Sequence, residues 1–415
     1  MNTLDPKSSS SSSAAAQGLA LLAGGGTGGH VFPALVVAQE MRRRGWSVAF
    51  AGKAGGIEAR LAEQADLAFH PIEARPLVGR GVVGKLRALW TTLRSAGSAR
   101  ALVRRLDARV VLGTGGYICA PAVLGAWLAG RPALLLEPNG RAGVANRWLS
   151  RWSKEVLVSW RSAEADFPTA VRCIGTPVRP DFFEVQPLRQ EELEGREERR
   201  ILILGGSQGA AELNRRLPPV IARLREAIPS LRVVHQCGER HAAAARSAYD
   251  DLGLGDEVEV IPFISDVAAA MANADLVLSR AGAITLAELC AAGRPALLLP
   301  LSVALGHQRD NAAALVEAEA AELVAAQESP EQLSQRALAW LTNASQLERR
   351  AAAARSLALP GAAAAAADRL EAWAGGSSAG LSEPPKRRRS AGPSTESQSS
   401  EIESTPEPAS DGGVH

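Results

Sequence analysis

Short apolar runs alternate with longer amphipathic stretches along most of the chain. Ten of these runs are rich in Val, Leu, Ile and Ala and lack strict alternation of polar and apolar positions, as is typical of parallel strands buried on both faces. They predict two sets of strands, the first at 19–23, 47–51, 109–112, 133–136 and 156–159, the second at 200–204, 232–236, 258–262, 276–278 and 296–300.

Amphipathic helical patterns fill the gaps between these runs, for example at 33–44, 214–227 and 285–292. Alternating strands and helices predict parallel sheets joined by right-handed crossovers. We therefore expect an α/β protein with two Rossmann-like, doubly wound parallel-sheet domains. Ligands of such sheets bind beyond the carboxyl ends of the strands, so we expect the site in the cleft between the domains.

Both ends of the chain are of low complexity, with a serine tract at 8–13 and a basic cluster at 386–389. Such segments bury too little apolar surface to offset the entropy lost on ordering, so residues 1–17 and 376–415 are expected to be disordered. A Gly-Thr-Pro turn at 175–177 and a charged stretch at 189–200 mark the boundary between an N-terminal domain at 18–180 and a C-terminal domain at 181–359.

Composition limits the classes of function. Hydrophobic residues make up 46% and charged residues 22% of the 415 residues, as in a globular protein with a sizeable core. The net charge of +2 gives no argument for nucleic acid as a partner, so none is expected. The four cysteines are far apart and lack CxxC spacing, which argues against a disulfide framework or a zinc site and favours a reducing cytoplasm.

Glycine-rich loops follow several of the predicted strands. GGGTGGH lies at 24–30, GTGGY at 113–117 and GGSQG at 205–209. Glycines let the backbone approach an anionic group closely, and the N-terminus of a following helix favours negative charge. The dinucleotide pattern with its acidic residue and the Walker lysine are both missing. A turn would explain each loop alone, but the set favours ligand binding over packing.

A fourth motif at 280–288 follows the strand predicted at 276–278, and its Thr285 and Glu288 would share one face of a new helix. One interpretation is a capping box, with Thr285 as the cap and Glu288 three residues later. We favour the other interpretation, in which backbone amides at 283–285 bind phosphate and Glu288 accepts hydrogen bonds from a ribose diol.

Two single side chains are also candidates for chemistry. His30 ends the first glycine-rich loop, and the ordinary histidine pKa of about 6.5 suits abstraction of a proton from a hydroxyl. A histidine at the start of a helix is the plainer alternative. Arg179 follows the turn at 175–177, where its guanidinium could bind a diphosphate or form an interdomain salt bridge.

Together these motifs resemble the MurG family of peptidoglycan N-acetylglucosaminyltransferases (glycosyltransferase family 28), which has the two-domain GT-B fold. The resemblance covers residues 18–375 and rests on GGTGGH at 25–30, GTGGY at 113–117, EPNG at 137–140, PVR at 177–179, GGSQGA at 205–210 and the stretch 280–288. The family transfers N-acetylglucosamine, with inversion, from UDP-GlcNAc to the 4-hydroxyl of lipid I, the MurNAc-(pentapeptide)-pyrophosphoryl-undecaprenol acceptor. The product is lipid II.

The resemblance also implies roles for individual residues. His30 is the implied base, with Glu137 as a second candidate, and residues 360–375 form a helix that packs back on the N-terminal, acceptor-side domain. The implied donor-binding residues are Thr27, Gly28 and Gly29 near the donor, Asn139 and Gln308 on the sugar, Arg179 and Ser207 near the diphosphate, Ile264 on the uracil through its backbone, and Ala283, Ile284, Thr285, Leu286, Ala287 and Glu288 on the phosphates and ribose.

An inverting displacement needs a base on the acceptor hydroxyl and neutralisation of the leaving diphosphate. Helix N-termini, backbone amides and Arg179 can neutralise the diphosphate without a metal ion. No DxD-like pair of acids stands out in the sequence. We therefore expect neither a metal site nor another cofactor.

The sequence departs from the family pattern mainly on the acceptor side. Leu136 and Pro138 flank Glu137 where the family often has His and Gln, Leu305 replaces a common Asp, and Cys119 replaces a small hydroxyl residue. These departures keep open a GT-B transferase with another lipid or aglycone acceptor. A sugar-nucleotide-binding protein without catalysis is a further alternative, against which the presence of His30 and Glu288 speaks, and a UDP-GlcNAc 2-epimerase would need more acids and bases around the sugar.

The stretch 75–94 mixes apolar side chains with Arg80, Lys85, Arg87 and Arg94. It is either a mobile loop and helix with a solvated basic face or a peripheral contact with the anionic membrane surface that holds the lipid acceptor. The chain lacks a signal peptide and any run of the ~20 apolar residues that span a bilayer. We therefore expect a peripheral protein on the cytoplasmic face of the inner membrane.

Overall fold

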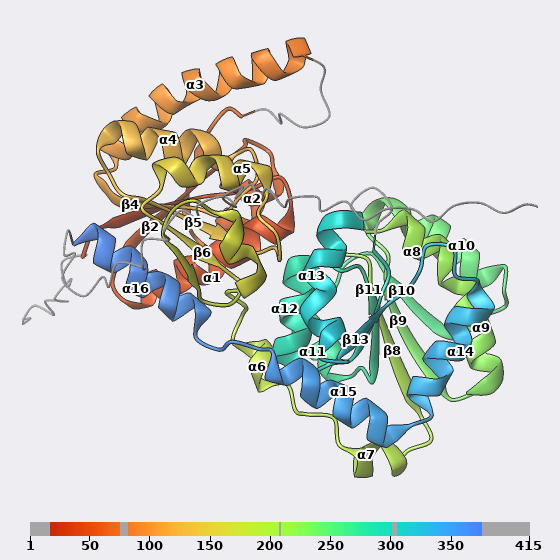
Figure 1. Ribbon diagram of the computed structural model, residues 1–415. Coiled ribbons are helices and arrows are strands. Elements are labelled where there is room, and N and C mark those ends of the chain that lie inside the picture. Colours follow the sequence, from red (N-terminus) through yellow and green to blue (C-terminus); the bar gives the residue numbers. More distant parts are fainter. Residues whose placement is uncertain (1–16, 75–81, 207–208, 301–304, 376–415) are drawn as a thin grey trace, which may run out of the picture. The chain divides into compact units, whose positions relative to one another are not determined.

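The computed structural model of the protein describes residues 17–74, 82–206, 209–300 and 305–375. These residues form two parallel sheets with helices on both faces of each (Figure 1). The first sheet has the strand order β3-β2-β1-β4-β5-β6-β7 and the second the order β10-β9-β8-β11-β12-β13. The expected α/β class with two doubly wound parallel sheets is therefore confirmed.

The strands of both sheets are short, and all of their pairings are parallel. The first sheet contains β1 (Leu19–Ala23), β2 (Ser47–Gly52), β3 (Ala68–Pro71), β4 (Ala108–Gly113), β5 (Ala133–Glu137), β6 (Glu155–Val158) and β7 (Val171–Cys173). The second contains β8 (Arg199–Leu204), β9 (Leu231–Gln236), β10 (Val258–Ile261), β11 (Leu276–Ser279), β12 (Ala296–Leu298) and β13 (Ala321–Leu323).

The helices follow the strands in alternation (Figure 1). Those of the first half are α1 (Gly28–Arg43), α2 (Ile57–Gln64), α3 (Val82–Arg105), α4 (Cys119–Ala129) and α5 (Val144–Leu149). Those of the second half are α6 (Asp181–Glu184), α7 (Gln190–Glu194), α8 (Ala211–Arg216), α9 (Pro218–Ala227), α10 (Ala242–Asp250), α11 (Val267–Ala272), α12 (Ala283–Ala292), α13 (Leu305–Glu317), α14 (Pro330–Leu341), α15 (Ala344–Ser356) and α16 (Ala362–Ala374).

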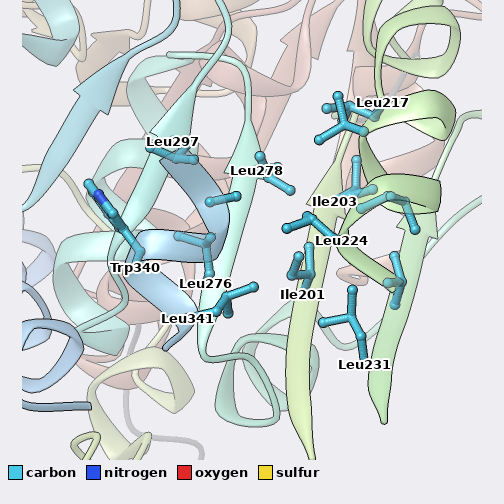
Figure 2. Packing of buried hydrophobic residues seen from close by; sticks show 14 of the residues in the cluster. Ile201, Ile203, Leu217, Leu224, Leu231, Leu276, Leu278, Leu297, Trp340 and Leu341 are labelled. Atoms are coloured by element: carbon cyan, nitrogen blue, oxygen red, sulfur yellow. The ribbon is translucent and has the colours of Figure 1, made fainter. Parts of the chain in front are cut away.

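The interior strands are buried on both faces, which explains why their sequences are apolar without alternation. In β1, Leu21 and Ala23 pack into the core under α3 and α4, whereas Ala20 and Leu22 pack into the core under α1, α2 and α16. In β8, Ile201 and Ile203 face one side of the second sheet, and Leu202 and Leu204 face the other. Figure 2 shows the first of these second-sheet cores, in which Ile201 and Ile203 lie among leucines and Trp340.

The strands that the sequence patterns did not predict are β3, β7 and β13, and each lies at an edge of its sheet. Their side chains are mostly partly or fully exposed, so their sequences carry a weaker apolar signal than those of the interior strands. The ten predicted strands are all present, with ends that shift by up to two residues.

Two predicted helices differ from those observed, and proline explains one of the differences. The helix predicted at 214–227 is divided into α8 and α9 because Pro218 has no amide hydrogen to continue α8. The helix predicted at 33–44 begins earlier, at Gly28, so that Pro33 lies inside α1. The glycines at 28 and 29 and His30 therefore belong to the first turn of α1 rather than to a loop.

Helix α16 packs against the first sheet although it is the last helix of the described chain. Ala366, Ala367 and Leu370 lie in the same core as Leu22 and Val37. Arg369 Nε and Trp373 Nε1 donate to the Glu155 carboxylate at 2.9 and 3.0 Å, and Arg172 Nε donates to its other oxygen at 3.1 Å. Glu155 is almost fully buried, so this carboxylate joins α16 to β6 and β7 inside the protein.

Several predicted features lie outside the residues that the structure describes. The ends predicted to be disordered lie almost wholly outside the described residues, since only Gln17 of them is included. The same holds for the first part of the stretch 75–94. Among the helices of the described residues, none combines the length and hydrophobicity that a membrane span requires.

Glu155→Ala is expected to lower the free energy of unfolding by about 3 kcal/mol, because it leaves two guanidinium groups and an indole N–H without their buried acceptor. Urea denaturation at equilibrium measures the loss. The matched control is Glu63→Ala, an exposed position in α2 where a change of less than about 0.5 kcal/mol is expected. Equal denaturation curves for both variants would show that Glu155 does not hold α16 in place.

Candidate functional site

The motifs found in the first half of the chain lie at one edge of the first sheet. The motif at 24–30 follows β1, the motif at 113–117 follows β4, and Pro138 and Asn139 follow β5. Since β1, β4 and β5 are neighbours and all parallel, their carboxyl ends bring the three segments side by side. The first two segments meet directly through Thr114, whose N–H donates to Ala23 O at 2.9 Å and whose hydroxyl donates to His30 O at 2.6 Å.

Close packing between these two segments accounts for several of their glycines. A Cβ on Gly24 would overlap the Thr114 hydroxyl, and a Cβ on Gly116 would lie 2.6 Å from Gly25 O. A Cβ on Gly115 would lie 2.7 Å from His30 Nδ1. Packing therefore accounts for these three glycines, whereas the nearest atom to a Cβ on Gly29 would lie at 3.6 Å. That the glycine-rich loops as a set bind a ligand stays a prediction.

The His30 imidazole has a defined tautomer. Its Nδ1 lies 2.9 Å from the carbonyl oxygen of Thr114, which can only accept a hydrogen bond, so Nδ1 carries the proton. In a neutral ring this leaves Nε2 with a free lone pair. Burial lowers the pKa of His30, against the opposing effects of Glu137 and the Thr114 carbonyl, and keeps the ring neutral at neutral pH.

Glu137 ends β5 and is almost fully buried. Its Oε1 accepts hydrogen bonds from the amide and the side chain of Asn139 at 3.0 and 2.7 Å. Its Oε2 accepts from Gly143 N at 2.9 Å and from Asn146 Nδ2 at 3.0 Å. Four donors occupy the carboxylate, which therefore orients Asn139 and the turn before α5.

Glu58 is a further buried carboxylate at this edge that the sequence patterns did not single out. Its oxygens accept from Lys53 N at 3.0 Å and from Gly26 N at 3.4 Å, so α2 supports the segment after β1. Cβ atoms on Gly25, Gly52 or Gly56 would each lie 2.5 to 2.6 Å from its side chain. The glycine pair just before Glu58 is the signal that could have pointed to it.

At the second sheet, the stretch 280–288 forms the start of α12 directly after β11. The cap of α12 is Gly282, and Thr285 is the third residue inside the helix. The capping-box interpretation with Thr285 as the cap is therefore wrong. Ala283, Ile284 and Thr285 form the first turn, whose amides have no partner within the helix. The Leu286 side chain packs into the core, and Ala287 is buried.

Glu288 and Arg179 lie together although they are far apart in the sequence. Burial raises the pKa of Glu288 to about 8, with Arg179 acting to lower it and Asp181 to raise it. Arg179 lies 3.6 Å from the Asp181 carboxylate and over the Phe182 ring. The described part of the chain places no hydrogen-bond donor on the Glu288 carboxylate, which makes it suited to accept from the hydroxyls of a ligand.

Arg280 is a second cation that the sequence patterns did not assign to a role. It directly follows β11, and its guanidinium lies so close to Gly206 that a Cβ there would overlap Arg280 Nη2. Burial lowers the pKa of Arg280, which still carries its charge at neutral pH. Guanidinium groups and helix N-termini both attract anions, so this arrangement can bind a phosphate group.

The other predicted donor-binding residues that the structure describes lie in or next to α1, after β10 and in α13. Thr27 is the exposed cap of α1, with Gly28 and Gly29 as its first two residues. Ile264 follows β10 and packs against the core of the second sheet, and Gln308 lies partly buried in α13. Ser207 lies outside the described residues. Among the residues that are described, no three His, Cys, Asp or Glu side chains lie close enough to bind a metal ion.

Similar proteins match nearly the whole described chain. A relative from Marinobacter nauticus, a UDP-N-acetylglucosamine--N-acetylmuramyl-(pentapeptide) pyrophosphoryl-undecaprenol N-acetylglucosamine transferase, is 41% identical over 344 residues, which cover 82% of this chain and 93% of the relative. A relative with the same description from Sorangium cellulosum is 42% identical over 359 residues, or 85% of this chain and 87% of the relative.

Solved structures agree with the sequence relatives. The structure of MurG from Acinetobacter baumannii has a TM-score of 0.70 and 33% identity and covers 85% of this chain and 99% of that one. The calicheamicin glycosyltransferase CalG4 has a TM-score of 0.61 at 18% identity, covers 86% of this chain and 98% of its own, and supports the fold alone.

Family models match both halves of the chain. The model of the glycosyltransferase family 28 N-terminal domain matches residues 20–158, and that of the family 28 C-terminal domain matches residues 200–368. The resemblance drawn from the motifs is thus confirmed. The chain belongs to glycosyltransferase family 28 and has the GT-B fold.

Proposed function

We propose that this protein transfers N-acetylglucosamine from UDP-GlcNAc to the 4-hydroxyl of the muramyl sugar of lipid I, with inversion, to give lipid II. The description of its relatives supplies the donor and the acceptor. The observation that carries the chemistry is the neutral His30 ring, whose free Nε2 lies at the carboxyl edge of the first sheet. A base of this kind is what an acceptor hydroxyl needs at neutral pH.

The reaction is a single displacement. The 4-hydroxyl oxygen of the acceptor attacks C1 of N-acetylglucosamine from the face opposite UDP, and its proton passes to His30 Nε2. The bond between C1 and the diphosphate oxygen breaks, and its electron pair leaves with UDP. Attack from the opposite face inverts the configuration at C1.

The charge that develops on the leaving diphosphate requires fixed positive groups. We assign this role to the first-turn amides of α12, to Arg179, which acts on Glu288 in α12, and to Arg280, which lies against Gly206. Glu288 would accept hydrogen bonds from the ribose diol, with Ile264 at the uracil and Asn139 and Gln308 at the sugar. We also assign Ser207 to the diphosphate, as the family resemblance implies.

Glu137 has a supporting role in this scheme. Because its two oxygens already accept four hydrogen bonds, it lacks a free lone pair directed at an acceptor hydroxyl. Its negative charge instead favours the protonated imidazole that forms when His30 takes the proton. We therefore assign the base to His30 and the orientation of Asn139 to Glu137.

A membrane contact would bring the enzyme to its lipid acceptor. Exposed apolar side chains gather on α3, α4 and α5, which lie together on one side of the first sheet (Figure 1). They are Trp90 and Leu93, Trp127 and Leu128, and Val144 and Trp148, and exposed arginines at 94, 147 and 151 accompany them. Apolar anchors with arginines suit an anionic bilayer surface, so we propose peripheral attachment there on the cytoplasmic face.

The direct test is transfer of radiolabelled N-acetylglucosamine from UDP-GlcNAc to a short-chain lipid I analogue in the presence of EDTA. A labelled disaccharide product is expected. If no product forms although calorimetry shows that UDP-GlcNAc binds, the acceptor is wrong. Product that forms only without EDTA would show that the leaving diphosphate needs a metal ion in addition to the amides and arginines of the protein.

His30→Ala is expected to lower the turnover number by about 10²- to 10⁴-fold, because the acceptor hydroxyl loses its base. The affinity for UDP-GlcNAc should change little, since His30 belongs to the first sheet and the nucleotide to the second. Steady-state transfer and calorimetry measure the two quantities. The control is His241→Ala, at the start of α10, with transfer like that of the wild type. Near-normal turnover of His30→Ala would remove His30 from the base role.

Glu288 should make UDP-GlcNAc binding depend on pH. With a pKa of about 8, Glu288 is ionised in only about a tenth of the ligand-free protein at pH 7. Since the diol binds the ionised form, affinity should rise roughly eightfold between pH 7 and pH 8.5. Glu288→Gln should bind more weakly and without this pH dependence, whereas Glu331→Gln, exposed in α14, should behave like the wild type. Calorimetry that shows a flat wild-type profile would contradict the ribose assignment.

A double variant, Trp90→Glu with Trp127→Glu, should bind vesicles of phosphatidylglycerol and phosphatidylethanolamine about tenfold more weakly, because it places charge where apolar side chains would enter the interface. These side chains are 63% and 55% exposed, so the fold should tolerate the change. Leu252→Glu, an exposed position after α10, is the control. Vesicle sedimentation that shows equal binding would reject this surface as the membrane contact.

A further inference from the structure

Three buried polar side chains form a hydrogen-bonded chain beneath the carboxyl edge of the second sheet. His235 in β9 has Nδ1 at 2.9 Å from the Tyr249 hydroxyl and Nε2 at 3.0 Å from Asn214 Oδ1. Tyr249 comes from α10 and Asn214 from α8, and both His235 and Tyr249 are fully buried. None of the three has a part in the chemistry proposed above.

The direction of every hydrogen bond in this chain follows from its last member. Asn214 Nδ2 donates to Cys237 O at 2.9 Å, so the side-chain oxygen of Asn214 is the atom that faces His235. That oxygen can only accept, which places a proton on His235 Nε2. Nδ1 then accepts from the Tyr249 hydroxyl, and a neutral His235 satisfies every group. Burial lowers the pKa of His235 to about 4, which agrees with a neutral ring.

The chain ends on a carbonyl that is packed against the glycine-rich loop after β8. A Cβ on Gly209 would overlap Cys237 O, and the φ of +72° at Gly209 favours glycine as well. The spacing between this loop and the end of β9 therefore depends on where Cys237 O lies. Asn214 fixes that carbonyl from the other side.

The end of β9 also holds the segment after β10. Cys237 N donates to Ile261 O and Gly238 N to Pro262 O, each at 3.0 Å. Gln236 Nε2 joins the two sides, because it donates to Gly206 O at 3.0 Å and to Pro262 O at 3.1 Å. Residues 236–238 thus bridge the loop after β8 and the segment that leads to Ile264.

We propose that Tyr249, His235 and Asn214 are positioning residues for the nucleotide, which act through Cys237 O to set the distance of Gly206 and Gly209, after β8, from the segment 261–264. This inference rests on the proposed function, in which these two segments hold the diphosphate and the uracil. The three side chains touch no ligand themselves. A buried polar chain of this kind stabilises one arrangement only when all of its members are paired, so the loss of one should loosen the loops.

Tyr249→Phe is the sharpest substitution, because it keeps the ring and removes only the hydroxyl that donates to His235 Nδ1. Calorimetry with UDP is expected to show about tenfold weaker binding than in the wild type, because binding must then order segments whose spacing the chain no longer sets. The KM for the short-chain lipid I analogue should be unchanged, since the acceptor belongs to the first sheet.

The matched control is Leu341→Val, which removes one methylene from a fully buried side chain of α14 in the same core. It should lower the melting temperature and leave UDP binding as in the wild type. If Tyr249→Phe binds UDP like the wild type, or if both variants lose the same affinity, the positioning role is wrong and the donor assignment stands. If the wild type itself does not bind UDP, the donor assignment fails and this proposal with it.

The nitrogen chemical shifts of His235 in the wild-type protein test the chain without any substitution, and so also if Tyr249→Phe does not fold. A neutral ring with the proton on Nε2 is expected at pH 6. A proton on Nδ1 would reverse every hydrogen bond in the chain and overturn the proposal.

Discussion

Thr114 joins the segments that follow β1 and β4 through its amide, its hydroxyl and its carbonyl. The amide and the hydroxyl hold Ala23 and His30 by their backbones, and the carbonyl accepts the Nδ1 proton of the imidazole. Because that last bond decides which ring nitrogen keeps its lone pair, the basicity of the site depends on backbone geometry. The glycines at 24, 115 and 116 leave the space in which these contacts form.

The buried carboxylates of the protein differ in the hydrogen-bond donors around them. This difference distinguishes carboxylates that support the fold from one that is suited to bind a ligand. Glu137 and Glu155 each accept from several donors, and Glu58 accepts from two backbone amides. A carboxylate with several such donors holds together the elements that supply them. Glu288 lacks donors from the described chain, and burial raises its pKa to about 8. A group that the fold leaves unsatisfied in this way is suited to a ligand that brings its own hydroxyls.

Each half of the chain holds a histidine whose tautomer is set by a neighbouring hydrogen-bond acceptor. In the first, a threonine ties two segments together and sets the tautomer of a histidine that we place in the chemistry. In the second, an asparagine sets the tautomer of a fully buried histidine, and a tyrosine hydroxyl donates to its other nitrogen. Both ring nitrogens of His235 have partners, whereas only Nδ1 of His30 has one, so of the two histidines His30 is the one suited to take a proton.

The sequence by itself determined the class of the fold and the location of the loops. Strands such as β1 and β8 are buried on both faces, and their apolar runs reveal this locally, whereas β3, β7 and β13 lie at sheet edges and lack the signal. Glycines after strands likewise mark the carboxyl edge of a parallel sheet, because strand, turn and helix are contiguous in the chain.

Only the tertiary structure decided which partners each polar residue has. The sequence offers His30 as the candidate base and Glu137 as a second one. Only the structure shows that donors from residues up to nine positions away occupy Glu137. Thr114, Glu58 and the partners of His235 likewise act across segments that only folding brings together. Hydrogen bonding and burial fix the protonation of a side chain, and both depend on neighbours in space rather than on neighbours in the sequence.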